Sequence, residues 1–532
     1  MTTHWHSHYF MSRQQMREYD RIAMAEVGIA GVVLMENAGR AVAEMAARMA
    51  GGDRTRHISI VAGPGNNGGD GFVAARHLLN AGYDVTVHLA VNPERIAGDA
   101  LPNYQVLRRM GACFEDITRI TALIDLKDEL RQASVVVDAL LGTGISRPVE
   151  GQFADIIDIM NDAGVPILAV DVPSGLDADR GVPANTAVRA AETVTFGHYK
   201  TGLVLHPGSS LAGRCHVVPI GVPGAVSTQA GINGEVLHGE MMRARLPGRP
   251  ADAHKGTCGH LLLLAGSLGK SGAAVMAGNG ALRVGTGLAT IATTSLAQPV
   301  IESRCTEIMV EGVMEKVDAA INDRHMKRLE ALLDGKRALV VGPGLTTAPG
   351  ISNLVMRLLQ MIAVPAVVDA DGLNMLAADP TAAGRITAPL VLTPHPGEMA
   401  RLSGKTVLEV QADRIQAARS LAEWHKAVVV LKGARTVIAA PDGRIFINPT
   451  GNPGMATAGT GDVLAGMIGG FLAQGLSPLD AAIVGTYLHG VAGDVAALRL
   501  SRAAMLAGDL LDEIPVILRD WECQRPPTEP TA

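Results

Sequence analysis

Residues 57–79, HISIVAGPGNNGGDGFVAARHLL, join an apolar run to a helical pattern through a glycine-rich turn. Apolar residues after the turn recur at helical spacing, at Phe72, Val73, Ala75, Leu78 and Leu79. A strand, a glycine turn and a helix in this order suit phosphate binding, because the first N–H groups of the helix face the end of the strand. The spacing is neither GxGxxG nor Walker A, so it predicts nucleotide handling without a familiar cofactor signature. A plain Asn-Gly turn is the alternative.

The same alternation of apolar runs and helical stretches continues along the chain. In the first half, apolar runs predict buried strands at residues 57–62, 85–89, 135–138, 167–171 and 193–196. In the second half, they predict strands at residues 261–265, 289–292, 339–341, 366–369, 391–392 and 428–431. This pattern is typical of parallel sheets covered by helices. We therefore predict an α/β fold with two doubly wound domains, the first a Rossmann-like three-layer sandwich.

The domain boundary is expected in residues 218–234, VPIGVPGAVSTQAGING, which are rich in Gly, Pro and small polar residues. A chain of 532 residues exceeds the size at which one hydrophobic core keeps growing. We therefore expect domains at residues 1–228 and 229–532.

Composition indicates a soluble enzyme in a reducing compartment. The formal net charge is -6 without a basic block, which argues against a nucleic-acid partner. No apolar run reaches the roughly 20 residues of a membrane span, so we expect no membrane partner. The cysteines are scattered without metal-ligand spacing, at Cys113, Cys215, Cys258, Cys305 and Cys523. Cytoplasmic localisation follows as the expectation, and the Ala-rich composition leads us to expect a homo-oligomer.

Polar residues follow several strands of the first half. Asp138 ends one apolar run and precedes a second glycine turn, residues 142–148, while Asp171 and Ser174 follow another run. The carboxyl ends of parallel strands share one edge, so these loops are expected to converge on one crevice. Oxygen ligands from Asn67, Asp138 and Ser174 would suit a hard cation such as an alkali metal, which leaves Asp171 for substrate. Each aspartate alone could equally cap a helix.

In the second half, residues 452–462, NPGMATAGTGD, run directly into the apolar stretch VLAGMIGGFL. Gly459, Thr460 and Gly461 would supply backbone donors to a phosphate at the start of a helix. Asp462 would lie near a hydroxyl that attacks phosphorus, where a carboxylate can act as general base. A tight turn that only leads into a buried helix is the alternative.

The first half resembles the NAD(P)H-hydrate epimerase domain in four stretches: VAGPGNNGGDGFVAARHL, DALLGTGISRP, DVPSGLDAD and TVTFGHYKTGLVLHPG. The resemblance implies that these residues contact the hydrated nicotinamide nucleotide: Asn66, Asn67, Gly68, Gly69, Asp70, Gly142, Thr143, Gly144, Ile145, Ser146, Arg147, Pro148 and Asp171. It also implies that Asn67, Asp138 and Ser174 hold potassium. In such a substrate the ring nitrogen expels hydroxide from C6, and water returns from the other face. Asp171 is expected to shuttle the proton.

The second half resembles the ribokinase-like ADP-dependent NAD(P)H-hydrate dehydratase in AGSLGKSGAAVMAGNGALRVGTGL, VVGPGL, DADGLN, LTPHPGEMARL, LKGARTVI and NPTGNPGMATAGTGDVLAG. The resemblance implies an ADP site at Lys432, Gly433, Ala434, Arg435, Thr436 and Gly461. It places the hydrate beside Ala273, Gly344, His395 and Asp462. Phosphoryl transfer to the C6 hydroxyl would turn a poor leaving group into a good one, with Asp462 as base and Mg²⁺ bridging the diphosphate.

Other interpretations of the second half remain open. Thr346 stands where related chains often have the last glycine of GPGLG. His395 could instead be a core residue that caps a turn, and Lys432 and Arg435 could be surface cations. The glycine cradle would also serve a vitamin-precursor kinase of the ribokinase type, fused to an N-terminal half that binds nucleotides without catalysis.

Overall fold

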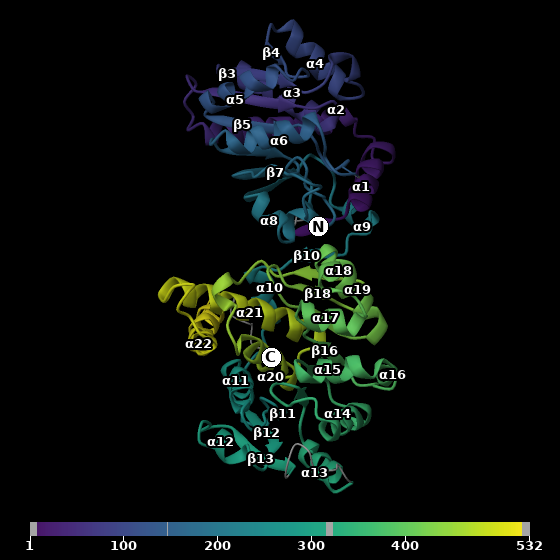
Figure 1. Cartoon of the computed structure of the whole chain (residues 1–532), viewed down its shortest axis with the longest axis vertical. Coiled ribbons are helices and arrows are strands. Elements are labelled where there is room, and N and C mark those ends of the chain that lie inside the picture. The colour runs from purple at the N-terminus through teal and green to yellow at the C-terminus, as the bar shows by residue number, and fades with distance from the viewer. Residues whose placement is uncertain (1–7, 146, 315–322, 524–532) are drawn as a thin grey trace. The chain divides into compact units, whose positions relative to one another are not determined.

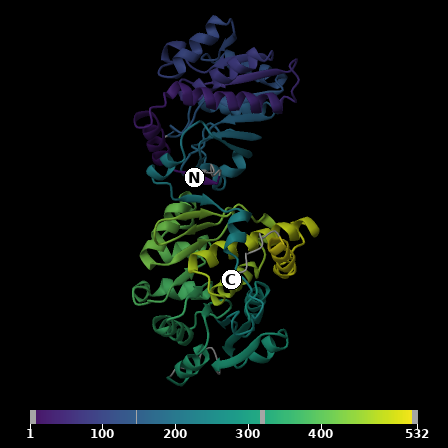
Figure 2. The same ribbon diagram turned by 180° about the vertical axis from the view of Figure 1, so that it is seen from behind.

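The computed structural model describes residues 8–145, 147–314 and 323–523 (Figure 1; Figure 2). The chain forms two compact units that divide between Glu235 and Val236. The boundary expected after residue 228 would cut helix α9 (Ala225–Gln229). Val226 and Ala230 lie in a hydrophobic cluster with Met11 and Tyr19, so residues 229–235 belong to the first unit.

The first unit contains a seven-stranded parallel sheet in the order β4-β3-β2-β5-β6-β7-β9. Its strands are β2 (His57–Ala62), β3 (Asp84–Leu89), β4 (Cys113–Asp116), β5 (Val135–Ala139), β6 (Ile167–Val170), β7 (Glu192–Phe196) and β9 (Arg214–Val218). The chain leaves β2 in one direction along the sheet and returns to add β5 on its other side. The order therefore reverses between β2 and β5, and ligands of open α/β sheets bind at such a point.

Helices cover both faces of this sheet because neighbouring strand residues point to opposite sides. Ile60 packs with α2 (Gly31–Met49), α3 (Asn66–Asn80) and α4 (Ala100–Arg109). Val61, the next residue, packs instead with α5 (Ala122–Gln132) and α6 (Gln152–Asp162). The three layers confirm the fold class predicted for the first half.

A smaller group of elements lies beside the C-terminal ends of these strands. Strand β1 (Tyr9–Met11) pairs in parallel with β8 (Tyr199–Lys200) and antiparallel with β10 (Gly234–Val236). Helix α1 (Arg13–Ala25) follows β1 directly. It begins with a capping box in which Ser12 and Gln15 satisfy each other's backbone N–H groups. The short helices α7 (Thr201–Val204) and α8 (Gly208–Leu211) continue from β8.

The sheet of the second unit runs in the order β13-β12-β11-β14-β15-β16-β17-β18-β19. Its parallel strands are β11 (His260–Leu264), β12 (Leu288–Thr294), β13 (Met309–Met314), β14 (Ala338–Val341), β15 (Ala366–Val368), β16 (Leu390–Leu392) and β17 (Val428–Leu431). Strands β18 (Val437–Ala439) and β19 (Ile445–Ile447) add an antiparallel edge. The order reverses between β11 and β14, which places the expected crevice of this unit at their ends.

Two sets of helices cover this second sheet (Figure 1; Figure 2). One set shares the main hydrophobic cluster with the strands: α10 (Gly239–Arg245), α11 (Ser271–Arg283), α20 (Thr460–Ala473), α21 (Pro478–Arg499) and α22 (Ala507–Cys523). The other set comprises α13 (Asp323–Leu333), α14 (Pro349–Met361), α15 (Asp371–Ala378), α17 (Pro396–Ser403) and α19 (Arg414–His425). The second half is thus also an α/β unit with a mainly parallel sheet, as predicted.

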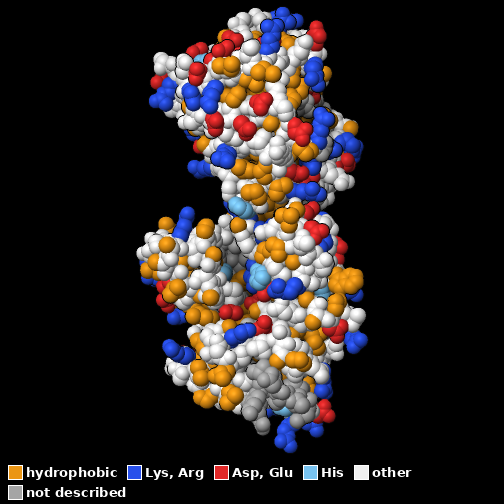
Figure 3. Space-filling model, in the orientation of Figure 1, with side chains coloured by type: hydrophobic (Ala, Val, Ile, Leu, Met, Phe, Trp, Pro, Cys, Tyr) orange, Lys and Arg blue, Asp and Glu red, His pale blue; other side chains and the backbone are white. Residues whose placement is uncertain are grey.

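Among the described residues, helix α21 is long and apolar enough to cross a membrane by length and composition alone. In the fold, 67% of its apolar window is buried, where it packs against α20 and α22. Burial inside the unit therefore accounts for its composition. On the face drawn in Figure 3, acidic and basic side chains are interspersed over both units.

Candidate active sites

The first unit contains a cavity of about 880 Å³ where the order of its strands reverses. Many of the expected substrate residues line it: Asn66, Asn67, Asp70, Gly142, Thr143, Gly144, Ile145, Arg147, Pro148 and Asp171. Ser146 falls outside the described residues. Gly68 and Gly69 lie in the first turn of α3 and not in the cavity lining. Their contact with substrate stays a prediction.

Close backbone contact explains the glycines of this turn. A Cβ atom on Gly68 would lie 2.0 Å from the carbonyl oxygen of Gly63, and one on Gly63 would lie 1.9 Å from that of Leu140. A side chain at Gly63 would force the loops after β2 and β5 apart, and one at Gly68 would force α3 away from the loop after β2. The glycines therefore bring both loops to the edge of one cavity.

Asp171 is held at the end of β6 by a buried lysine. Its backbone has a φ of 64°, and its Oδ1 accepts hydrogen bonds from Thr195 Oγ1 at 3.1 Å and from the Phe196 N–H at 3.3 Å. Lys200 Nζ also donates to Oδ1, and the lysine side chain is only 2% exposed. Lys200 donates further to Thr195 Oγ1 and to the carbonyl of Phe196, both at 3.0 Å. This network fixes the carboxylate in the cavity wall.

Sequence reasoning did not single out Lys200. It lies in YKTGLVL, on a two-residue strand, between the half-buried Tyr199 and the buried Thr201. A lysine surrounded by apolar residues and glycines was the available signal, because a buried ammonium needs a charged partner. Asp171 is that partner.

Of the expected cation residues, Asp138 and Ser174 bind each other beside the cavity, and Asn67 is in the cavity lining. Asp138 is fully buried and accepts from Ser174 Oγ at 2.5 Å and from the Ser174 N–H at 2.8 Å. No Lys or Arg of the described residues pairs with it, and burial raises the pKa of its carboxyl to about 6. Asn67 has a buried amide nitrogen without a partner, and a Cβ on Gly142 would lie 3.3 Å from its Oδ1. An oxygen-rich set with an uncompensated carboxylate fits a monovalent cation.

In the second unit, the glycine-rich segment leads into helix α20 as predicted. Gly459 is the N-cap residue, with a φ of 94° that a side chain would strain. Thr460 uses its hydroxyl inside the loop, donating to the carbonyls of Met455 at 3.1 Å and Thr457 at 3.0 Å. Its own carbonyl faces His489 Nε2 at 2.8 Å. Because the hydroxyl is engaged, Thr460 has only its backbone N–H to offer a phosphate, as expected.

Lys432 and Asp462 are half-buried members of one cluster of charges. Lys432 Nζ donates to Asp369 Oδ1 at 2.7 Å, and that oxygen also accepts from Thr393 Oγ1 at 2.8 Å. A Cβ on Gly461 would lie 3.4 Å from Lys432 Nζ, so the lysine sits against the start of α20. Lys432 is only 19% exposed, which excludes the interpretation as a surface cation.

The electrostatics of this cluster act on Asp462. Burial raises the pKa of Asp462 to about 6, repulsion from Asp369 adds to the increase, and Lys432 opposes it. Burial also raises the pKa of Glu398. For Lys432, burial lowers the pKa, but attraction to Asp369, Glu398 and Asp462 outweighs it and raises the pKa overall. Sequence reasoning missed Asp369 and Glu398 as site residues, although Asp369 follows an apolar strand just as Asp138 does.

The expected nucleotide loop, residues 432–436, is wrapped around a buried arginine from α19. The guanidinium of Arg414 donates to the carbonyls of Leu431 at 3.1 Å, of Lys432 and Arg435 at 3.3 Å, and of Ala434. Burial lowers its pKa to about 10, so the group stays charged at neutral pH. Arg435 has a φ of 57°, a conformation that these contacts stabilise. The Arg414 guanidinium therefore stabilises the conformation of the loop through hydrogen bonds to its carbonyl groups.

His395 is the N-cap residue of α17. Its Nδ1 accepts from the N–H groups of Gly397 at 3.0 Å and Glu398 at 3.4 Å, and Glu398 Oε2 accepts from the His395 N–H at 2.8 Å. The capping interpretation is thus confirmed, but the side chain is 52% exposed and is not part of the core. The same side chain therefore keeps an exposed edge for a ligand.

Ala273 and Gly344 meet where the order of strands reverses in this unit. A Cβ on Gly344 would lie 3.0 Å from that of Ala273, and Ser267 Oγ donates to the Gly344 carbonyl at 2.7 Å. Thr346 follows with a φ of 75°, and its N–H donates to Asp371 Oδ2 at 2.8 Å. This φ lies in the left-handed region that favours glycine, the residue that related chains often have here.

Comparisons with known proteins assign both halves. The family model described as YjeF-related protein N-terminus matches residues 31–202, and the one described as NAD(P)H-hydrate dehydratase matches residues 261–516. A Moorella thermoacetica protein named bifunctional NAD(P)H-hydrate repair enzyme Nnr is 45% identical over 97% of this chain and 97% of its own length. Its namesake from Escherichia coli is 34% identical over 94% of this chain and 92% of its own.

A solved Bacillus subtilis structure, described as ADP/ATP-dependent NAD(P)H-hydrate dehydratase co-crystallized with ATP/Mg2+, is 36% identical. It covers 54% of this chain and 98% of that chain, with a TM-score of 0.47. The full-length identity to the named relatives and the match of both family models establish the relationship. The chain belongs to the family of bifunctional NAD(P)H-hydrate repair enzymes.

Proposed function

We propose that this chain repairs hydrated NADH and NADPH in two steps. The first unit interconverts the R and S hydrates, and the second unit dehydrates the S hydrate with ADP, releasing AMP and phosphate. The observation that carries the proposal is the pair of sites at the two reversal points, in a chain of this family. Each site has an aspartate bound to a lysine that is 2% exposed in the first unit and 19% exposed in the second.

In the first unit, the cavity holds the nucleotide between the loops after β2 and β5. Both loops offer backbone N–H groups, and the start of α3 adds the partial positive charge that a diphosphate needs. Asp171 faces the nicotinamide ring and exchanges protons with the C6 hydroxyl or with water. Potassium would be held by Asn67, Asp138 and Ser174, where it would neutralise the buried carboxylate and fix the two loops.

In the second unit, Asp462 accepts the proton of the C6 hydroxyl as its oxygen attacks the β-phosphorus of ADP. The bond between that phosphorus and the bridging oxygen breaks, and AMP leaves. Lys432 and the N–H groups of residues 459–461 stabilise the charge on the transferred group. The ring nitrogen then expels phosphate from C6, and loss of a proton from C5 restores the double bond of NADH.

Magnesium, when bound, neutralises the charge of the diphosphate. No group of three or more His, Cys, Asp or Glu side chains in the described residues is placed to hold a metal ion. Magnesium bound to the diphosphate would be held mainly by phosphate oxygens and water, with a carboxylate such as Asp369 or Glu398 as a further ligand.

The test is to incubate the full chain with mixed R and S hydrates, ADP, Mg²⁺ and K⁺ and to follow the absorbance of reduced nicotinamide. Complete recovery requires both activities. Recovery of the S fraction alone would leave the first unit as a binding module. Phosphorylation of hydroxymethyl vitamin precursors by ATP, without any recovery of NADH, would instead identify a kinase.

A further inference from the structure

Helix α1 forms one wall of the cavity in the first unit and precedes the family match at residues 31–202. Met16, Asp20 and Met24 line the cavity, spaced four residues apart. Such spacing places side chains on one face of a helix. Asp20 is therefore the polar group in an otherwise apolar stripe that faces the substrate space.

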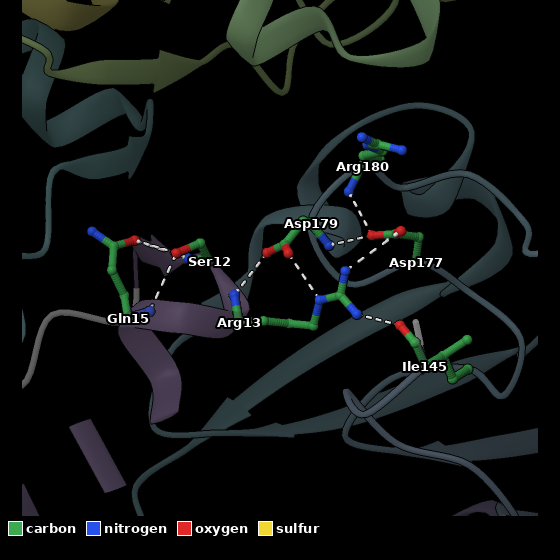
Figure 4. A network of polar contacts seen from close by, with 7 residues as sticks. All are labelled: Ser12, Arg13, Gln15, Ile145, Asp177, Asp179 and Arg180. Atoms are coloured by element: carbon green, nitrogen blue, oxygen red, sulfur yellow. Dashed lines mark hydrogen bonds and ion pairs between the residues drawn. The ribbon is translucent and has the colours of Figure 1, made fainter. Parts of the chain in front are cut away.

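Arg13, in the first turn of α1, joins this helix to the glycine loop at residues 142–148 (Figure 4). Its backbone N–H and its Nε donate to the carboxylate of Asp179, at 2.7 and 2.8 Å. Its Nη1 donates to the carbonyl of Ile145, in the glycine loop after β5, and its Nη2 lies 3.7 Å from Asp177 Oδ2. One side chain thus ties α1 to the loop that lines the cavity. The position of Asp20 relative to that loop is set by these contacts.

Asp20 shares the cavity with charged groups from three other elements. Lys200, Asp171 and Asp70 line the same space, from β8, the end of β6 and α3. Burial raises the pKa of Asp20 to about 6; Lys200 opposes the increase and Asp171 adds to it. Burial also raises the pKa of Asp70 well above its usual range, with Asp171 and Asp20 adding to the effect. Arg147, Asp99 and Glu150 also line the cavity, so its carboxyl groups outnumber its cations. This excess of carboxyl groups favours the protonated forms of Asp20 and Asp70.

Epimerisation at C6 needs proton transfer on both faces of the ring. Hydroxide leaves one face as water when it receives a proton, and the cation that remains takes up water on the other face, which must lose a proton. Asp171 serves the side of the sheet. A second group of opposite role is required for the other face, and Asp20 is a carboxyl group of the same cavity that comes from another element, α1.

We propose that Asp20 is a second catalytic acid–base residue of the epimerisation, acting from the α1 side of the cavity while Asp171 acts from the sheet side. The inference rests on the proposed function of the first unit. One carboxyl group gives its proton to the leaving hydroxyl, and the other takes a proton from the entering water. Each turnover moves one proton from one carboxyl to the other, and exchange with solvent resets the pair.

The variant Asp20→Asn tests this role in the full chain. We expect its epimerase kcat to fall by about 10²-fold or more, the typical contribution of an acid–base group, with little change in KM. Asp20→Glu should restore part of the rate. Glu18→Gln is the matched control, because Glu18 lies on the same helix but is exposed and paired with Arg21. Its rate should equal that of the unmodified chain.

The pH profile separates catalysis from a structural role. The singly protonated pair is the active form, so kcat/KM should fall as pH rises through about 6, where Asp20 loses its proton. The residual rate of Asp20→Asn should lack that decrease. ADP-dependent dehydration of pure S hydrate by the second unit reports in the same sample that the variant is folded.

Full epimerase activity in Asp20→Asn would overturn the inference and leave the proposed function intact. A raised KM with an unchanged kcat would also overturn it, because Asp20 would then only bind substrate. Absence of epimerisation in the unmodified chain would instead refute the proposed function of the first unit.

Discussion

The two units place their sites at the same point of the fold, but a different helix supplies a carboxyl group to each site. In both, the loops after the strands at the reversal point touch: Gly63 meets Leu140 in the first unit, and the Gly266 N–H donates to Pro343 in the second. In both, an aspartate after a later strand holds a lysine, Asp171 with Lys200 and Asp369 with Lys432. A further carboxyl group comes from a helix: Asp20 from α1 in the first unit and Asp462 from α20 in the second.

The two helices suit different reactions. The second unit has a glycine-rich helix start beside its helical carboxylate, so it can bind a phosphoryl group next to a base. In the first unit, Asp20 lies near the middle of α1, away from the start of the helix. It shares the cavity with the carboxyl groups of Asp70 and Asp171. Proton transfer is the chemistry available there. The same α/β framework thus supports two reactions through the helix that completes each site.

The largest effect should come from Asp462→Asn. Asparagine cannot accept the proton of the hydroxyl, so we expect dehydration of S hydrate to fall by about 10² to 10⁴-fold. ADP affinity, measured by calorimetry, should change little. R-to-S conversion by the first unit is the internal control, since it uses other residues. Normal dehydration in this variant would show that Asp462 is not the base.

A second prediction concerns the pH dependence of dehydration. Asp462 works as a base when ionised, and its pKa is about 6, so the rate should rise as pH increases through about 6 and then level off. Removal of the attraction in Lys432→Met should move this rise to higher pH. Removal of the repulsion in Asp369→Asn should move it to lower pH. Rate profiles of both variants, with thermal melts to verify folding, check the opposite signs; shifts in the same direction would contradict the arrangement.

The central strands and several strand-end groups could be predicted from sequence. Buried parallel strands are continuous Val, Ile and Leu runs, so β2, β5 and β17 were found nearly at their true ends. The edge strands β4, CFED, and β9, RCHVV, lack such runs because one side pairs with nothing in the sheet. Whether a strand lies at the edge of a sheet depends on the tertiary fold, so the local sequence pattern cannot predict it.

The site residues divide in the same way. Asp138 and Asp171 were found because each ends an apolar run, which places it at the carboxyl edge of the sheet. Asp20 and Arg414 lie on helices, where charged residues usually face solvent. Asp20 is half-buried in the lining of the cavity, and Arg414 is buried against the loop at residues 432–436. Only the packed structure distinguishes them from surface charges.

Arg414→Ala should have an intermediate effect, on the second unit alone. The carbonyls of the nucleotide loop would lose their buried donor, so we expect the free energy of unfolding to fall by about 2 to 4 kcal/mol. ADP binding should weaken by about tenfold as the loop loses its conformation. Arg444→Ala is the control, because that arginine is exposed and pairs with Asp442. Equal ADP affinity in Arg414→Ala and the unmodified chain would show that the loop keeps its shape without the arginine.

The smallest effect should be a gain in stability from Thr346→Gly. Thr346 has a φ of 75°, which costs a non-glycine residue about 1 to 2 kcal/mol. Its buried hydroxyl also lacks a partner. Glycine gives back about 0.4 to 1 kcal/mol through the greater freedom of the unfolded chain. We therefore expect a net gain of about 0.5 to 1 kcal/mol, measured by denaturant unfolding.

The neighbouring residue provides the control for this variant. Thr347 is exposed and is not among the residues with positive φ. Thr347→Gly should therefore destabilise the chain, because glycine there adds only unfolded-state freedom. Opposite signs at adjacent threonines would locate the strain in the backbone of Thr346. Destabilisation by both variants would mean that the contacts of the Thr346 side chain outweigh its strain, and that this loop uses its threonine in place of the usual glycine.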